Sequence, residues 1–145
     1  FHSGIPITLI PLDVTYKCLL TSEDVERLNR TGSPIARFVR DATGVYMEFY
    51  KKYEGFDGCA LHDPLTLATI IAPELLTFEN HYVDVDISGG ISMGNTLADF
   101  MKVSKKPANV KVALGVRGRE FVELFIERME TLSASVGTHT AEDGG

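Results

Sequence analysis

Residues 58–65 have the sequence Gly58-Cys59-Ala60-Leu61-His62-Asp63-Pro64-Leu65. The first half is a short apolar run typical of a strand, and the proline marks the start of a helix. His62 and Asp63 therefore lie side by side where a strand delivers the chain to a helix. Histidine can protonate a leaving group near neutral pH, and a carboxylate can bind a hard cation. One turn could thus supply both kinds of chemistry.

Composition indicates one globular domain with a core, since 44% of the 145 residues are hydrophobic and 23% are charged. The net charge of −6 argues against nucleic acid or an anionic membrane as the main partner. No apolar run is long enough to span a membrane, and the first residues do not form a signal peptide. Cys18 and Cys59 lack metal-ligand spacing, so we expect buried free thiols in a reducing compartment, the cytoplasm.

The hydrophobic pattern predicts an α/β fold. Residues 5–12 form an apolar run that is typical of a strand buried on both faces of a parallel sheet. Residues 109–116 predict another strand, and the alternation over residues 82–88 predicts a half-exposed strand that residues 91–100 rejoin. We therefore expect a mostly parallel sheet flanked by helices, with a small antiparallel ribbon.

Capping signals define the helices. Thr21 with Asp24 predicts a capping box and a short helix that ends at Gly32, and Ser33 before Pro34 opens a long helix that ends at Gly55. The long helix carries an apolar stripe: Ile35, Phe38, Val39, Ala42, Val45, Tyr46, Phe49, Tyr50 and Tyr53. Residues 64–71 predict a buried helix that is apolar nearly all round, and residues 120–132 predict an amphipathic helix. We expect one domain over residues 1–137 and a disordered tail over residues 138–145.

His62 and Asp63 each have a structural and a functional interpretation, and Asp13 is a further candidate. Asp63 before proline is a common helix N-cap, and its functional alternative is a ligand for a divalent cation. Calcium takes six to eight oxygens, so Asp63 alone cannot complete a site. His62 either hydrogen-bonds backbone groups or acts as an acid. Asp13 follows the first strand, at a position where ligands often bind.

Tyr46 and Tyr50 stand one helical turn apart. They are either core residues with their hydroxyls at the edge, or a phenol pair on the rim of a pocket for a planar ligand. The basic residues Lys102, Lys105 and Lys106 favour a solvated loop over a phosphate site. The chain contains no glycine-rich phosphate loop, nucleophile elbow or self-contained catalytic triad.

Four segments, in order, resemble one known family: residues 11–15 (Pro-Leu-Asp-Val-Thr), 58–65, 73–76 (Pro-Glu-Leu-Leu) and 83–85 (Val-Asp-Val). Over residues 1–130 the chain resembles the C-terminal half of inosine–uridine preferring nucleoside hydrolases, and the His-Asp-Pro-Leu turn is the strongest element. The resemblance implies the corresponding half of that fold. It also implies Ca²⁺-dependent hydrolysis of the N-glycosidic bond of ribonucleosides to free base and ribose, in cytoplasmic purine or pyrimidine salvage by a homo-oligomer.

The resemblance also implies roles for individual residues. Asp63 matches a calcium ligand, and His62 matches the residue that contacts and protonates the leaving base. Tyr46 and Tyr50 match pocket tyrosines on a variable helix. The family's N-terminal aspartate cluster, which supplies most of the calcium ligands, does not occur in this sequence. We therefore expect the isolated chain to be inactive, with the remaining ligands coming from elsewhere.

A different class of function is also open. The same half of the fold could serve as a non-catalytic binding or assembly module. The neighbouring His62 and Asp63 favour the enzyme, because a scaffold needs a cap at Asp63 but no histidine beside it. The missing aspartate cluster favours the module for this chain taken alone. A third interpretation is another calcium-binding hydrolase with a similar turn.

Overall fold

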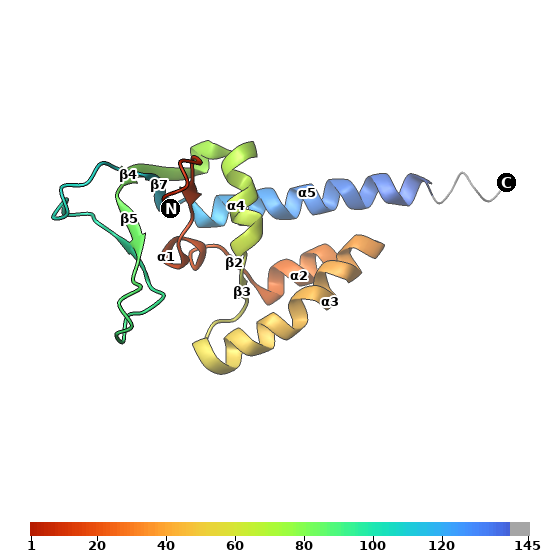
Figure 1. Ribbon diagram of the computed structural model, residues 1–145. Coiled ribbons are helices and arrows are strands. Elements are labelled where there is room, and N and C mark those ends of the chain that lie inside the picture. The colour runs from red at the N-terminus through yellow and green to blue at the C-terminus, as the bar shows by residue number, and fades with distance from the viewer. Residues whose placement is uncertain (140–145) are drawn as a thin grey trace.

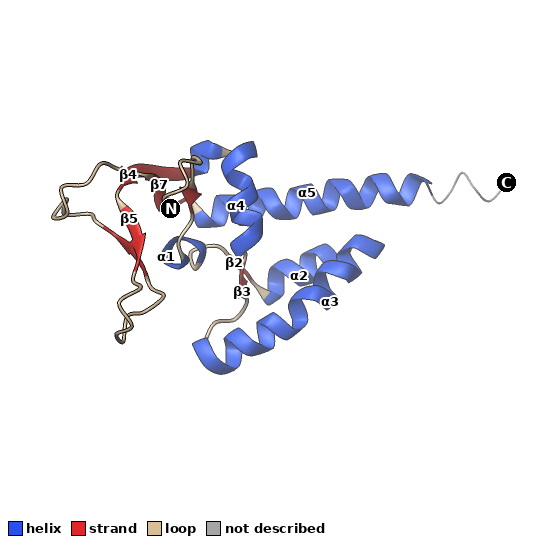
Figure 2. Ribbon diagram, viewed as in Figure 1, coloured by secondary structure: helices blue, strands red, loops and turns tan. Residues whose placement is uncertain are grey.

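The computed structural model describes residues 1–139 and their side chains as far as residue 135. The fold is α/β. In Figure 1 β4, β5 and β7 lie at the left, α2, α3 and α5 extend to the right, and β2 and β3 lie between them; Figure 2 shows the same arrangement coloured by element type. The helices are α1 (Leu12–Thr15), α2 (Ser22–Asn29), α3 (Pro34–Phe49), α4 (His62–Ile71) and α5 (Gly118–His139), with a π-helical turn at Tyr50–Glu54 and a 3₁₀ turn at Pro73–Leu75. No helix in the described part is long and apolar enough to cross a membrane.

The main sheet has three strands in the order β1-β7-β4. The central β7 (Val110–Val116) pairs in parallel with β1 (Thr8–Leu9) and antiparallel with β4 (Leu76–His81). A ribbon of β5 (Val83–Val85) and β6 (Thr96–Ala98) is antiparallel, as the alternation predicted, although both strands are shorter than expected. β4 was not predicted, because its mixed sequence Leu-Thr-Phe-Glu-Asn-His shows no clean alternation.

The prediction of a strand over residues 5–12 buried on both faces was wrong. Only Thr8–Leu9 form a strand, and Leu12 already begins α1. β1 is an edge strand among the described residues, with β7 as its one neighbour. Ile5, which precedes β1, is 69% exposed.

The predicted caps of α2 and α3 are confirmed. Thr21 and Asp24 form a reciprocal capping box, and the Ser33 hydroxyl accepts a hydrogen bond from the Ala36 amide. The apolar stripe predicted for α3, in contrast, is not buried as a whole. Val39 and Tyr50 are buried, whereas Phe38, Val45, Tyr46, Phe49 and Tyr53 are at least half exposed. The stripe is wider than the surface that α2 and α5 cover.

The predicted burial of residues 64–71 was also wrong. α4 buries Leu65 and Ala68, but Leu67, Ile70 and Ile71 on its outer side are exposed. α5 is longer than the expected residues 120–132 and includes Thr138 and His139, which were expected in the tail. The rest of that predicted tail, residues 140–145, lies outside the described part of the chain.

The core brings the segments around residues 14–20 and 58–65 together with α5. Val14, Leu20, Leu65 and Ile126 are fully buried in one cluster. Gly118 begins α5 in close contact with the preceding part of the core, since a Cβ there would lie 1.9 Å from the Lys17 carbonyl oxygen. The backbone approach therefore fixes the start of α5 against the segment that follows α1.

Asp24 links the cap of α2 to α5. Its side chain is 4% exposed, and both carboxylate oxygens accept hydrogen bonds of 2.9 Å from the Arg119 guanidinium. Burial opposes ionisation, but the bonds from Arg119 and Thr21 outweigh burial and hold the pKa of Asp24 below its ordinary value. A carboxyl whose pKa is lowered by folding stabilises the fold above its unfolded pKa of about 4, and this contribution is lost as the pH falls through the folded pKa.

We expect Asp24→Asn to lower the free energy of unfolding by about 2 kcal/mol at pH near 7, because the neutral amide loses the charged bonds to Arg119. The difference from wild type should shrink as the pH falls below about 4, because the Asp24 carboxyl is protonated first in the unfolded chain and, at lower pH, in the folded protein. Urea denaturation across this pH range measures the effect. Glu26→Gln is the matched control, because Glu26 is an exposed acid on the same helix. An Asp24→Asn difference that is independent of pH would contradict the charge argument.

Candidate active site

The pairing of two short strands sets the position of the turn that contains His62. β2 (Leu19–Leu20) pairs antiparallel with β3 (Cys59–Ala60), and the Leu61 amide donates to the Cys18 carbonyl at 3.0 Å. Gly58 adopts a φ of 145°, and a Cβ at this position would lie 2.5 Å from the Leu20 carbonyl oxygen. Glycine is therefore required just before the turn. This pairing places His62 at the first position of α4, next to the end of α1.

Two hydroxyl groups hold the half-buried His62 ring. Its Nδ1 atom lies 2.8 Å from Thr15 Oγ1, and its Nε2 atom lies 2.7 Å from the Tyr50 hydroxyl oxygen. The Tyr16 ring meets the imidazole edge-on at a centroid distance of 5.8 Å. Both ring nitrogens therefore have hydrogen-bond partners, and the orientation of the imidazole is fixed by two segments that are distant in sequence, one at Thr15 and Tyr16 and the other at Tyr50.

Tyr50 reaches His62 from the end of α3, where the helix passes into a π-helical turn that ends at Gly55. Such turns are rare and are frequent at functional sites. The Tyr50 ring stacks on Phe56 at 6.2 Å, and the residue is only 6% exposed. Burial, assisted by the neighbouring Tyr16 hydroxyl, raises the pKa of Tyr50. The phenol therefore stays protonated near neutral pH and is available as a hydrogen-bond donor.

Asp63 is exposed in the first turn of α4 and does not cap the helix. The N-cap is Leu61, and no side chain caps this end. The capping interpretation of Asp63 is therefore wrong. Within the described part of the chain its carboxylate has no hydrogen bond or ion pair, so both oxygens are available to a ligand. An exposed carboxylate beside the end of α1 fits one ligand position of a calcium ion.

The structure separates the two predicted tyrosines. Tyr50 contacts His62, whereas Tyr46 lies one turn earlier on α3 and is 62% exposed, with no contact to His62 among the described side chains. Asp13 is exposed in α1 and lines, with Leu12 and Phe100, a largely apolar cavity of about 610 Å³. No group of three or more histidine, cysteine or acidic side chains in the described residues could hold a metal ion. The described residues therefore form no complete metal site by themselves.

Two contacts of His62 were missed in the sequence. Thr15 and Tyr16 lie two and three positions after Asp13, and both lie against the imidazole. Their position after a predicted strand was the available signal, because side chains at strand ends commonly line sites. The thiols of this region agree with expectation, since Cys18 and Cys59 are buried and free. Burial raises the pKa of Cys18 to about 11, so the thiol is a packing group.

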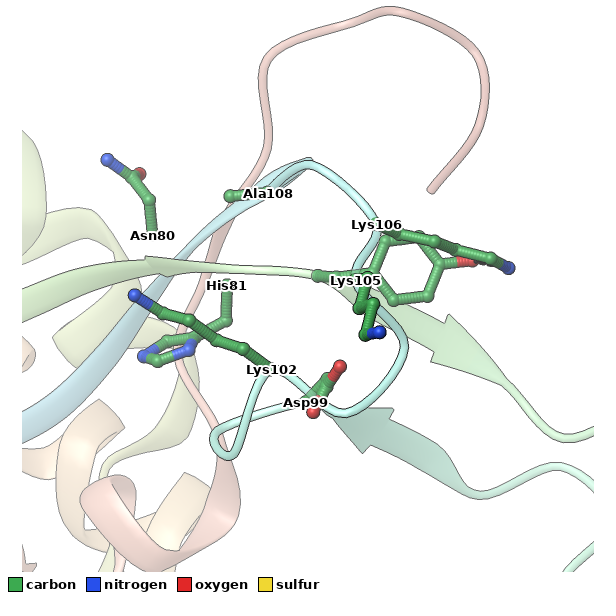
Figure 3. Close-up of a pocket in the computed structure, with 8 residues that line it drawn as sticks. Asn80, His81, Asp99, Lys102, Lys105, Lys106 and Ala108 are labelled. Carbon is green, nitrogen blue, oxygen red and sulfur yellow. Dashed lines mark hydrogen bonds between the residues drawn. The ribbon is translucent and has the colours of Figure 1, made fainter.

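The basic residues lie elsewhere. Lys102, Lys105 and Lys106 line a cavity of about 350 Å³ beside His81 and Asp99, at the junction of β4 and β5 (Figure 3). Lys106 donates a hydrogen bond of 2.8 Å to the Tyr82 hydroxyl. This cavity shares no lining residue with the His62 turn.

Known proteins that resemble this chain are nucleoside hydrolases. The sequence model of the family described as inosine-uridine preferring nucleoside hydrolase matches residues 1–123. The chain is 35% identical over 130 residues to the pyrimidine-specific ribonucleoside hydrolase RihA of Citrobacter koseri, covering 89% of this chain and 42% of that protein. The same name belongs to a relative from Enterobacter sp., which is 35% identical over 134 residues, or 92% of this chain and 43% of that protein.

Solved structures show the same partial coverage. The purine-preferring ribonucleoside hydrolase from Gardnerella vaginalis superposes with a TM-score of 0.79 at 32% identity, over 90% of this chain and 42% of that one. A plant nucleoside hydrolase gives a TM-score of 0.77 at 28% identity, over 88% of this chain and 42% of that one. The chain thus spans less than half the length of these relatives. Because the family match extends over most of the sequence and the fold agrees, the chain belongs to the inosine-uridine preferring nucleoside hydrolase family.

Proposed function

We propose that this chain forms the base-facing part of a ribonucleoside hydrolase, which cleaves the N-glycosidic bond with water to give free base and ribose. The observation that carries the proposal is the His62 imidazole, hydrogen-bonded on both nitrogens and directly followed by the unpaired Asp63 carboxylate. An imidazole hydrogen-bonded to a protonated phenol suits proton delivery to a leaving base. Family membership supplies the reaction class.

The proposed chemistry needs a proton on the departing base. As the C1′–N bond breaks, its electron pair leaves with the base, and positive charge develops on the ribose in an oxocarbenium-like transition state. The water oxygen bonds to C1′ and releases one proton to the surrounding water, which balances the proton that the departing base takes up. We assign delivery of a proton to the base to the pair of His62 and Tyr50, whose heteroatoms are 2.7 Å apart. The Tyr16 and Phe56 rings pack around this pair and limit the access of bulk water.

We propose that a calcium ion completes the site, with Asp63 as one ligand. Such an ion, when bound, lowers the pKa of a coordinated water molecule and positions it. Calcium requires several more oxygen ligands than Asp63 provides, and the described residues hold no complete set. A complete set of ligands therefore needs a contribution from outside the described residues. Asp63 would then anchor the ion at the edge of the pocket, next to the residue that faces the base.

We propose a ribonucleoside as the substrate, with either a purine or a pyrimidine base. The similar proteins include one named as pyrimidine-specific and one named as purine-preferring, at nearly the same identity to this chain. Tyr46, which is exposed one turn before Tyr50, is our candidate for additional contact with the base. A cytoplasmic location and a homo-oligomeric state are likewise proposals.

The proposal predicts that the isolated chain neither hydrolyses nucleosides nor binds calcium tightly. Activity should appear when the chain is joined to the N-terminal part of the Citrobacter koseri relative, since that part would supply the missing ligands. Release of base from uridine and inosine, and isothermal titration with calcium, test both statements. Tight calcium binding by the chain alone would contradict the division of the site.

A binding or assembly module remains the second candidate, because the described residues form no complete metal site. The joined protein distinguishes the two functions. A joined protein that folds and binds calcium, yet releases no base from any ribonucleoside, would favour the module.

A further inference from the structure

Thr15 is the only described side chain that hydrogen-bonds to Nδ1 of His62. It is 2% exposed and sits on the last residue of α1. Its hydroxyl also lies 3.2 Å from the Leu12 carbonyl oxygen, in good geometry for donation to it. A threonine hydroxyl carries one proton and can accept as well as donate. The direction of these bonds therefore determines which nitrogen of the neutral imidazole carries the hydrogen.

Two arrangements of protons fit the heavy atoms. In the first, Tyr50 donates to Nε2, the Nδ1–H group donates to Thr15 Oγ1, and Thr15 donates to the Leu12 carbonyl. In the second, Thr15 donates to Nδ1 and the Nε2–H group donates to the Tyr50 oxygen. The first arrangement makes three hydrogen bonds with the same groups and the second makes two. The first arrangement is therefore favoured, because buried polar hydrogens generally have hydrogen-bond partners.

The second arrangement differs in one useful respect, since it leaves the Tyr50 proton free to point at a ligand. A base nitrogen or oxygen next to Tyr50 could accept that proton and restore the third hydrogen bond. Both arrangements use the same heavy-atom positions. The change between them balances when Nδ1 gives its proton to solvent water and Nε2 takes one from solvent water, while the two hydroxyl groups rotate. Thr15 permits the change because its hydroxyl can reverse its role, which an amide or a carboxylate could not do in the same way.

We propose that Thr15 is a positioning residue that sets the tautomer of His62: the ligand-free protein holds the Nδ1–H form through the chain of bonds from Tyr50 to the Leu12 carbonyl. The tautomer itself does not depend on the proposed function. Only its use in protonating a leaving base rests on that function. Thr15 would thus keep Nε2 as the acceptor of the Tyr50 hydroxyl. A hydrogen-bond acceptor on the substrate side would then favour the second arrangement.

The test is ¹⁵N NMR of the 145-residue chain with labelled histidine, recorded at about pH 9, well above the ordinary imidazole pKa. Correlations between the ring nitrogens and carbon-bound hydrogens identify the nitrogen that carries the proton. The His62 signals are assigned as those lost in His62→Gln. We expect Nδ1–H in the wild type, retention of this form in Thr15→Ser, and a change to Nε2–H in Thr15→Val, which has the same shape but no hydroxyl.

His81 provides an internal control. Its Nε2 atom lies 3.1 Å from a Glu79 oxygen and its Nδ1 atom is buried without a partner among the described residues, so its tautomer should be the same in all variants. An Nε2–H form of His62 in the wild type would overturn the proposal, and so would an unchanged tautomer in Thr15→Val. Thr15→Ala, which also lacks the hydroxyl group, makes the same test if the valine variant fails to fold. If the joined wild-type protein hydrolyses no nucleoside while His62 has the Nδ1–H form, the result would count against the proposed function of His62. The assignment of Thr15 would remain intact.

Discussion

Replacement of Asp63 by alanine is expected to abolish hydrolysis of every ribonucleoside by the joined protein. An exposed carboxylate without a partner in the described residues contributes little to folding, so the loss would come from the metal site. A metal ion contributes several kcal/mol to stabilisation of charge in a transition state, and about 4 kcal/mol corresponds to about a thousandfold in rate. We therefore expect kcat/KM to fall at least about a thousandfold on purine and pyrimidine substrates alike. Steady-state kinetics and calcium titration measure the two losses together.

Controls separate this effect from general damage. Asp41→Ala removes another exposed aspartate, on α3, and should change neither kcat/KM nor calcium affinity. The unfolding free energy of Asp63→Ala should stay within about 0.5 kcal/mol of the wild-type value, as expected for a surface position. Normal activity of Asp63→Ala would remove this residue from the metal site and would leave its exposure beside His62 unexplained.

The parts of the fold that local interactions determine were predictable. The capping box of Thr21 and Asp24 and the serine–proline start of α3 depend on residues within one turn of each other, and both are present. β4 depends instead on pairing with β7, which lies about 30 residues further along the chain, and its own sequence has no strong period. Burial was predicted least well. A regular apolar pattern shows that a helix has an apolar face, but the described residues leave Leu67 and Ile70 of α4 uncovered.

Some residues of the candidate site could likewise be predicted from the sequence, and others could not. His62 and Asp63 could be singled out because their types and adjacency carry chemical meaning. Thr15 could not, because it contacts His62 across 47 positions of sequence and a lone threonine after a strand has many ordinary roles. The choice between a cap and a free carboxylate at Asp63 depended on where α4 begins. Helix ends are uncertain from sequence by one or two residues, and that shift decides the question.

The second large effect is expected for His62→Ala, and it should depend on the leaving group. Inosine and uridine release poor leaving groups that need a proton, so loss of the imidazole should lower kcat on them by about 10²–10⁴-fold. A p-nitrophenyl riboside releases a stabilised phenolate that leaves without protonation, and its hydrolysis should change little. Tyr50→Phe should show the same pattern with a smaller loss, because it removes one hydroxyl and keeps the ring that packs on Phe56.

The comparison of substrates is what makes the experiment decisive. His62→Ala also breaks the hydrogen bonds to Thr15 and Tyr50, so it could disturb the pocket as a whole. Such a disturbance would slow both kinds of substrate by similar factors, since the ribose and the attacking water are common to them. Equal losses on inosine and the nitrophenyl riboside would therefore exclude a proton-delivery role for His62. A selective loss on the natural nucleosides, with the nitrophenyl substrate intact, requires that the imidazole acts on the departing base.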